Sequence, residues 1–166
     1  MKRRLTILTT LTMMALISSV FAVPSPMRAG GATQISGVGY FAAPGQCTDP
    51  EGQGASYSLI MSGALSGCHY VFIESAQCSP GGAYAEAGTE TFVGTYNGQV
   101  GTFRTNYLFT ATYLDCPNLA GEIAGRCQHP IAAGSGTGVF EGVKGRFDMS
   151  DDVEAGNFPY RGHLSF

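Results

Sequence analysis

The stretch ETFVGTYNGQVGTFRTNYLFTATYL, residues 90–114, decides the fold that this sequence predicts. Asn97-Gly98 divides it, and Asn-Gly favours a type I′ turn because both central residues of that turn need positive φ. The runs on either side, 90–96 and 99–114, are rich in the Thr, Val, Phe and Tyr typical of strands. The stretch therefore predicts an antiparallel hairpin, since the twist of this turn matches that of the strands it joins.

The second strand of this hairpin has two different faces. Side chains alternate along a strand, so one face carries Phe103, Thr105, Tyr107, Phe109, Ala111 and Tyr113. The other face carries Arg104, Asn106, Leu108, Thr110 and Thr112. Because neither set is uniformly apolar, we expect one face to line a cavity and the other to meet a second subunit.

The same alternation, bounded by Gly, Pro and Asn, recurs on both sides of the hairpin, and helical periodicity is nearly absent. Six further strands are expected, over residues 32–42, 56–61, 68–74, 122–132, 144–149 and 158–166. Eight short strands joined by short turns predict an all-β fold, an eight-stranded antiparallel up-and-down barrel with a lipocalin-like shape. A sandwich is the alternative, but closure into a barrel removes exposed sheet edges.

The first residues predict an export signal. Met1-Lys2-Arg3-Arg4 is basic, the apolar stretch 5–22 contains four Thr and two Ser, and it ends in the small residue Ala22. This order is typical of a cleaved secretory signal peptide. An uncleaved anchor is the alternative, because the stretch is nearly long enough to span a bilayer. We expect a secreted or periplasmic protein without membrane contact after cleavage, divided into a signal peptide (1–22), a short linker (23–31) and one barrel domain (32–166).

Charge excludes one class of partner. Without Lys2, Arg3 and Arg4 the chain keeps six basic residues (nine minus three) against twelve acidic ones, a charge of −6. Nucleic acid would not attract such a chain, so we expect no nucleic-acid partner. We also expect no metal and no cofactor.

All five cysteines, Cys47, Cys68, Cys78, Cys116 and Cys127, follow the predicted signal peptide. In an oxidising compartment these cysteines indicate disulfides. The sequence contains no C-x-x-C pair, so the cysteines do not suggest a zinc site. In an up-and-down barrel Cys68 and Cys78 lie about 33 Å apart along one strand. We therefore expect Cys47–Cys78, with Cys116 as a competing partner, and one cysteine without an intrachain partner.

Three stretches near the end of the chain are more specific. They are GRCQHPI (125–131), GTGVFEGVKGR (136–146) and DDVEAGNFPYRGHL (151–164). The G-T-G-x-F-x-G-x-x-G string, followed by a strand, a polar turn and a final strand, resembles the barrel family of allene oxide cyclases and dirigent proteins. The likeness is greatest to the exported bacterial members of that family, and before residue 125 only the number of strands matches.

The resemblance implies an eight-stranded barrel with an apolar lumen, which is often trimeric in the plant relatives. Those relatives cyclise an allene oxide or steer the coupling of phenoxy radicals, and their cavity acts mainly by orienting a reactive intermediate. Their functional residues cannot be transferred, because their pocket motifs lie on earlier strands that have no match here.

Five basic and aromatic residues are candidates to line a ligand site: Arg126, His129, Tyr160, Arg161 and His163. Arg161 and His163 share one side of a strand, and such a pair could orient a carboxylate or a phenol. Ion pairing with the surplus acids, for instance Glu122 or Glu141, is the alternative for the basic residues.

Two further motifs have structural interpretations. The glycine-rich string lacks the Lys-Ser or Lys-Thr of a phosphate loop, so we expect a tight turn that packs Phe140 under the barrel end, built on Gly136, Gly138, Phe140, Gly142 and Gly145. The acids Asp148, Asp151, Asp152 and Glu154 lack the spacing of a calcium-binding EF-hand and predict a solvated hairpin tip.

Three functions fit these features. The first is an exported barrel that binds a small apolar ligand or a partner without turnover, as a monomer or as a homo-oligomer (dimer or trimer). The second is a cyclase- or dirigent-type enzyme, an isomerase by class. The third is a structural exported protein with a solidly packed barrel. The absence of a compelling acid–base pair makes us lean against enzyme activity.

Overall fold

The computed structural model describes residues 31–48 and 54–166. The predicted signal peptide lies outside the described residues, as does the predicted linker except for Gly31. The described elements are β1 (Thr33–Phe41), β2 (Tyr57–Gly63), β3 (Leu65–Cys78), β4 (Ala83–Tyr96), β5 (Gln99–Asp115), the short 3-10 helix η1 (Cys116–Asn118), β6 (Ala120–Pro130), β7 (Thr137–Gly138), β8 (Lys144–Ser150) and β9 (Phe158–Ser165). No helix within the described ranges is long and apolar enough to cross a membrane.

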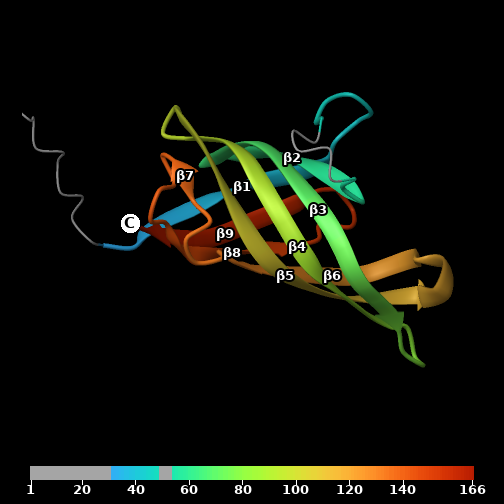
Figure 1. The fold of residues 1–166 in the computed structure, drawn as a ribbon. Coiled ribbons are helices and arrows are strands. Elements are labelled where there is room, and N and C mark those ends of the chain that lie inside the picture. The colour runs from blue at the N-terminus through green and yellow to red at the C-terminus, as the bar shows by residue number, and fades with distance from the viewer. Residues whose placement is uncertain (1–30, 49–53) are drawn as a thin grey trace, which may run out of the picture.

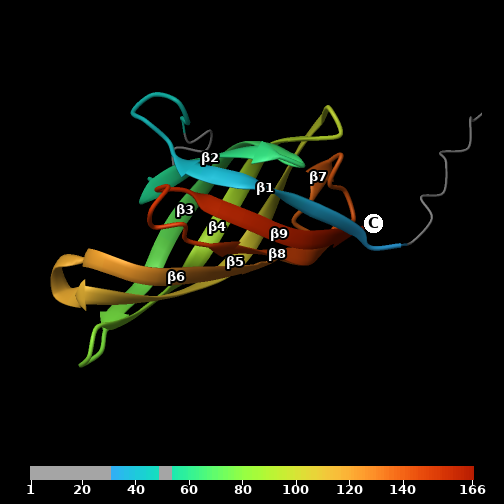
Figure 2. The same ribbon diagram turned by 180° about the vertical axis from the view of Figure 1, so that it is seen from behind.

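The strands close into an antiparallel barrel, which confirms the predicted fold class (Figures 1 and 2). Each of the eight main strands pairs with its neighbours in sequence order, and β9 pairs with β1 to close the ring. The two-residue β7 is an addition that the sequence did not predict, and it pairs with the start of β5.

The hairpin that decided the fold is present with the expected turn. Asn97 has φ 52° and Gly98 has φ 75°, so both central residues take the positive φ of a type I′ turn. The register that follows pairs Tyr96 with Gln99 and, further along, Glu90 with Thr105. The face with Phe103, Thr105 and Tyr107 is buried and therefore points into the barrel.

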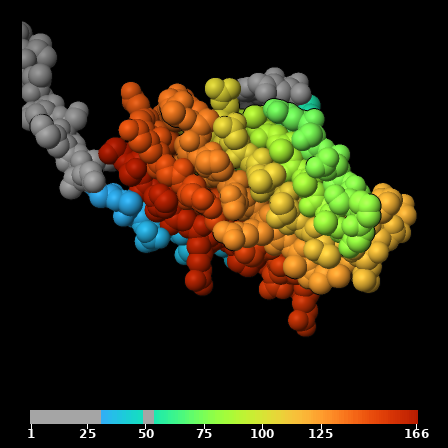
Figure 3. Space-filling view, turned by 90° about the horizontal axis from the view of Figure 1, so that it is seen from below, coloured from blue at the N-terminus to red at the C-terminus, as the bar shows by residue number. Residues whose placement is uncertain are grey.

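The strands differ greatly in length, which makes the barrel uneven. β3 and β4 have 14 residues each and β5 has 17, whereas β1 and β2 have 9 and 7. The β3–β4 and β5–β6 hairpins therefore project beyond the other strands (Figures 1 and 2). The space-filling view shows the green and orange residues of these hairpins gathered at one end of the molecule (Figure 3).

The expected Cys47–Cys78 disulfide is wrong. The structure joins Cys47 to Cys68 and Cys78 to Cys116, with a Cα–Cα distance of 5.8 Å in each pair. The expectation assumed strands of equal length, so that the ends of β1 and β3 would be level. Instead Cys68 pairs with Ile60, which in turn pairs with Tyr40 near the end of β1.

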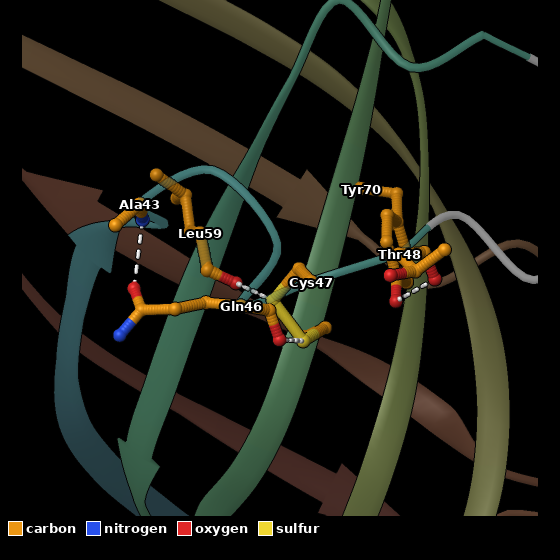
Figure 4. Close-up of a disulfide and its surroundings, with 7 residues drawn as sticks. Ala43, Gln46, Cys47, Thr48, Leu59 and Tyr70 are labelled. Carbon is orange, nitrogen blue, oxygen red and sulfur yellow. Dashed lines mark hydrogen bonds between the residues drawn. A yellow bond between two sulfur atoms is a disulfide. The ribbon is translucent and has the colours of Figure 1, made fainter.

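The end of β1 is thus level with the start of β3. The loop after β1 lies against β2 and β3 there, where the hydroxyl of Tyr70 donates to the carbonyl of Thr48 at 2.8 Å (Figure 4). Cys78 lies ten residues further along β3, beside Cys116 after β5. The separation of Cys68 from Cys78 and the competing role of Cys116 were both predicted correctly, and Cys127 is the free cysteine among the described residues.

One end of the barrel is packed solid. Phe140, in the loop between β7 and β8, is fully buried and packs against Phe92, Tyr96 and Phe103, with ring centroids 4.9 to 6.1 Å apart. Gly136 permits this, because a Cβ there would lie 1.8 Å from the carbonyl oxygen of Phe140. Apolar packing thus closes this end of the barrel interior, so a cavity inside the barrel has to open at the other end.

Candidate functional site

The opposite end of the barrel holds a cavity of about 480 Å³. Its apolar wall includes Phe41, Tyr57, Leu59, Phe109 and Phe158, and the projecting hairpins extend the wall with Ile73, Tyr84, Tyr113 and Leu119. A larger hollow of about 700 Å³ lies beside the Asn97-Gly98 turn, but among the described residues that line it only Glu141 is ionisable. The smaller cavity is the better candidate site, because it combines apolar walls with several buried ionisable groups.

A buried cluster of His69, Glu90 and His129 lies at the inner end of this cavity. Their side chains are at most 2% exposed, and they come from β3, β4 and β6. Nε2 of His69 lies 3.0 Å from Oε2 of Glu90, and Nε2 of His129 lies 3.4 Å from Oε1 of the same carboxylate. Glu90 and His129 line the cavity, so the cluster is accessible from it.

Glu90 is held from a further side by Thr105, whose hydroxyl donates to Oε2 at 2.5 Å. Burial by itself raises the pKa of Glu90, but the charge interactions and hydrogen bonds with His129 and His69 outweigh burial and hold that pKa well below its usual range. The carboxylate is therefore ionised and needs positive charge close to it.

Glu86 is a second buried carboxylate on the same strand and also lines the cavity. Tyr84 donates to its Oε2 at 2.6 Å and Tyr107 donates to its Oε1 at 2.8 Å. Burial, together with the bonds and charge of Glu86, raises the pKa of both phenols, so they remain neutral donors. Each oxygen of Glu86 thus has a partner within the protein.

Cys127 lines the cavity two residues before His129 on β6. Burial raises the pKa of this thiol, and the nearby carboxylates, Glu90 foremost, raise it further. The residue is a neutral thiol at physiological pH, which is the unreactive form.

The mouth of the cavity carries a pair of carboxyl groups, Glu122 and Asp151. Burial and the neighbouring Glu122 raise the pKa of Asp151 to about 7. Tyr113 donates to Oε2 of Glu122 at 3.5 Å, and burial together with the charges of Glu122 and Asp151 raises the pKa of this phenol to about 12. The rim is therefore acidic, and its charge increases as Asp151 ionises.

The raised pKa of Asp151 predicts that the protein loses stability between about pH 4 and pH 7. In this window the folded state holds a proton that the unfolded state has released, so this contribution is complete below about pH 4 and lost above about pH 7. We expect Asp151→Asn, which is neutral throughout, to gain stability relative to the native protein as pH rises from 4 to 8. Urea unfolding at both pH values measures this difference. Glu154→Gln, which alters an exposed acid nearby, is the control and should show no such trend. If the free energy of unfolding of Asp151→Asn changed with pH in the same way as that of the native protein, the argument would be contradicted.

The five residues expected to line a ligand site lie in different places. His129 is in the cluster and lines the cavity. Tyr160 points inward but fills the packed part, where its hydroxyl accepts from the Leu65 amide at 2.8 Å. The other three lie on the outer face of their strands: Arg126 pairs with Asp148 at 2.9 Å, Arg161 is exposed and His163 is half-buried. The structure therefore brings none of the other four to the cluster that contains His129.

The expected turn residues and acids also have definite places. Gly136, Gly138, Gly142 and Gly145 flank the buried Phe140 in sequence, and the last three have positive φ. Among the acids, Asp148 accepts from Arg126 and Arg146, which lowers its pKa against the effect of burial. Asp152 accepts from the Ala155 amide at 3.0 Å, and Glu154 is exposed.

Sequence reasoning missed His69, Glu86 and Glu90. A signal for Glu90 was present, because the Asn97-Gly98 turn sets a register that places it opposite Thr105, on the inward face. An acid on that face is unusual unless it is paired. His69 carries no comparable local signal.

No family model and no curated protein matches this chain.

Proposed function

We propose that the protein binds a small, largely apolar molecule that carries a hydroxyl or phenol group, with the apolar part in the cavity and the hydroxyl at the buried carboxylates. One observation supports this most strongly: the apolar cavity contains Glu86 and Glu90, and none of its described lining residues is Arg or Lys. Buried acceptors favour a ligand that donates a hydrogen bond. A packed structural barrel would have no reason to keep such groups, which are costly to bury.

The same charges argue against a carboxylate ligand. Glu122 and Asp151 stand at the mouth, and a carboxylate entering between them would meet like charge, which is unfavourable. Arg161, which was expected to orient a carboxylate together with His163, is exposed, and Arg126, another candidate lining residue, is on the outer face of its strand. The preferred head group is therefore a neutral donor.

The test uses three probes with the same ring system: 2-naphthol, naphthalene and 2-naphthoate. We expect chelator-treated protein at pH 7.5 to bind 2-naphthol most tightly and 2-naphthoate most weakly, as measured by calorimetry or by ring fluorescence. Cys127→Phe should weaken 2-naphthol binding more than about tenfold, a loss of about 1.4 kcal/mol, because the ring fills space beside the cluster. Cys127→Ala is the matched control, since it leaves that space open.

Equal binding of the three probes would remove the argument for a hydroxyl-bearing ligand. Absence of binding of any probe would favour the structural role instead. Circular dichroism of each variant establishes that it is folded before its affinity is compared.

A second candidate function is that of a cyclase- or dirigent-type enzyme, and the resemblance of residues 125–166 to that family remains the reason to consider it. The observation that favours it is the position of His129 and Glu90, which places an imidazole and a carboxylate beside the space for a ligand. Such groups can move a proton at a bound molecule. Isolation of a converted product from a bound phenolic or epoxide compound would favour this candidate over simple binding.

Localisation and assembly are part of the same proposal. The two disulfides are compatible with an extracellular or periplasmic protein. The mixed polar and apolar outer face of β5 is the basis for a homo-oligomer, a dimer or a trimer, and native mass spectrometry tests it.

A further inference from the structure

We propose that His69, Glu90 and His129 form a binding site for a divalent transition metal ion of the zinc class. The metal site shares Glu90 with the proposed ligand site, but the three residues can bind a metal whether or not a molecule occupies the cavity. It departs from the expectation, drawn from the sequence, that no metal is bound.

The first reason is the donor set and its spacing. One ligand atom from each of the three residues lies within 4.8 Å of the other two. Zinc bonds of about 2.0–2.1 Å at tetrahedral angles place neighbouring ligand atoms about 3.3 Å apart. The two histidine–carboxylate distances, 3.0 Å to Oε2 and 3.4 Å to Oε1 of Glu90, are close to this spacing, and no two of the three ligand atoms are more than 4.8 Å apart. Two imidazoles and one carboxylate are also a common protein ligand set for zinc with an open coordination position.

The second reason is the orientation of His129. Its Nδ1 lies 3.3 Å from the carbonyl oxygen of Phe147, which can only accept, so Nδ1 carries the hydrogen. In the neutral ring Nε2 then has a lone pair, and this atom lies 3.4 Å from Oε1 of Glu90. Two acceptors so close need a cation between them. A backbone carbonyl on Nδ1 is also the usual outer partner of a metal-binding histidine.

The third reason is His69, which distinguishes a metal from a proton. A proton on Nε2 of His129 would satisfy Oε1 of Glu90, and Thr105 already donates to Oε2. His69 would still be fully buried: its Nδ1 has no hydrogen-bond partner, and its Nε2 lies 3.0 Å from Oε2 of Glu90 but is not in line for a hydrogen bond to that oxygen. Leaving a buried polar group without a partner costs about 1–3 kcal/mol. A metal ion bound by Nε2 would give this nitrogen its partner.

The proposed metal site can be reached from the cavity. Glu90 and His129 line the cavity, whereas His69 is fully buried behind them. A metal held by the three would keep its remaining positions towards the cavity, where water or a ligand hydroxyl could bind. In that position the ion would act as a Lewis acid on the oxygen that it binds.

The test is zinc binding to the demetallated full chain, measured by calorimetry, with Co²⁺ absorption as a probe of coordination. We expect one ion per chain and a loss of affinity of more than about 100-fold in Glu90→Gln and in His129→Gln, since even outer-sphere partners contribute about 10–100-fold. Thr105→Val, which removes an outer partner of Glu90, should lose about 10–100-fold. The chain has three histidines, so His163→Gln is the matched control and should bind as the native protein does.

Thermal unfolding supplies a second readout that does not depend on activity. Zinc should raise the melting temperature of the native protein and of His163→Gln, and should leave Glu90→Gln and His129→Gln unchanged. If either ligand variant fails to fold, Thr105→Val and His163→Gln still separate a site at the cluster from binding elsewhere. Equal zinc affinity in native protein, Thr105→Val and Glu90→Gln would overturn the proposal, as would no binding at all.

The outcomes separate this proposal from the ligand proposal. Binding of 2-naphthol without zinc binding would overturn the metal site and leave the ligand cavity standing. Zinc binding at the cluster without binding of any naphthalene probe would support the metal site and remove the proposed ligand.

Discussion

Replacing Phe140 with Ala is expected to lower the free energy of unfolding by about 3–5 kcal/mol, the usual cost of deleting a buried Phe ring. The ring is fully buried and packs against Phe92 and Phe103 at centroid distances of 5.7 and 4.9 Å. Its neighbours come from β4 and β5, which are fixed in paired strands and cannot move in to fill the space. Urea unfolding measures this loss of stability, and we expect the m-value to be the same as that of the native protein.

Val100→Ala is the control for this prediction. Val100 is 74% exposed on β5, so its truncation should change stability by less than about 0.5 kcal/mol. If Phe140→Ala proves unfolded, Phe140→Leu should fold with a smaller loss. A loss below about 1 kcal/mol in Phe140→Ala would show that the ring does not close the barrel end as described.

The two ends of the barrel differ in their packing and in their ionisable groups. The closed end is packed by aromatic rings and has no ionisable cluster among the described residues, whereas the open end keeps Glu86, Glu90 and His129 beside a cavity. Burying ionisable groups costs free energy unless they are paired or hydrogen-bonded. The packed end therefore contributes to the stability of the barrel, and the open end holds the cavity at which we propose ligand binding.

The fold was largely predictable because its signals are local. Alternation along 99–114 and the Asn97-Gly98 turn depend only on neighbouring residues, and the strands formed where they were expected. Strand length was less predictable, since β3 begins at Leu65 and β4 at Ala83, well before the expected starts at residues 68 and 90. Pairing with long neighbouring strands extends a strand beyond what its own sequence indicates.

The site was less predictable because its residues meet only when the barrel closes. His69 and His129 are sixty residues apart in sequence and lie on strands separated by β4 and β5. The pairing of cysteines failed for a related reason, because it depends on which strand ends are level. Both properties follow from register around the whole barrel, and a single strand does not contain that information.

Removing the disulfide between Cys78 and Cys116 is expected to cost about 4 kcal/mol of the free energy of unfolding. The cross-link spans 38 residues, and closing a loop of that size restricts the unfolded chain by about this amount in the chain-entropy model. The double variant Cys78→Ala, Cys116→Ala should also bind 2-naphthol more weakly than the native protein. The disulfide ties together the two projecting hairpins, whose residues Tyr84, Tyr113 and Leu119 form the outer wall of the cavity.

The second disulfide is the matched control, because it spans only 21 residues and ties the loop after β1 to β3. Cys47→Ala with Cys68→Ala should cost slightly less stability, about 3 kcal/mol, and should weaken 2-naphthol binding less. Urea unfolding and the probe titration measure both properties on the same samples. Equal weakening of binding in the two double variants would mean that the projecting hairpins do not hold the wall of the cavity. If the Cys78→Ala, Cys116→Ala variant lost stability but not binding, the ligand would lie deeper, against Glu90 and His129. There the continuous strands of the barrel hold the site without help from the ends of the projecting hairpins.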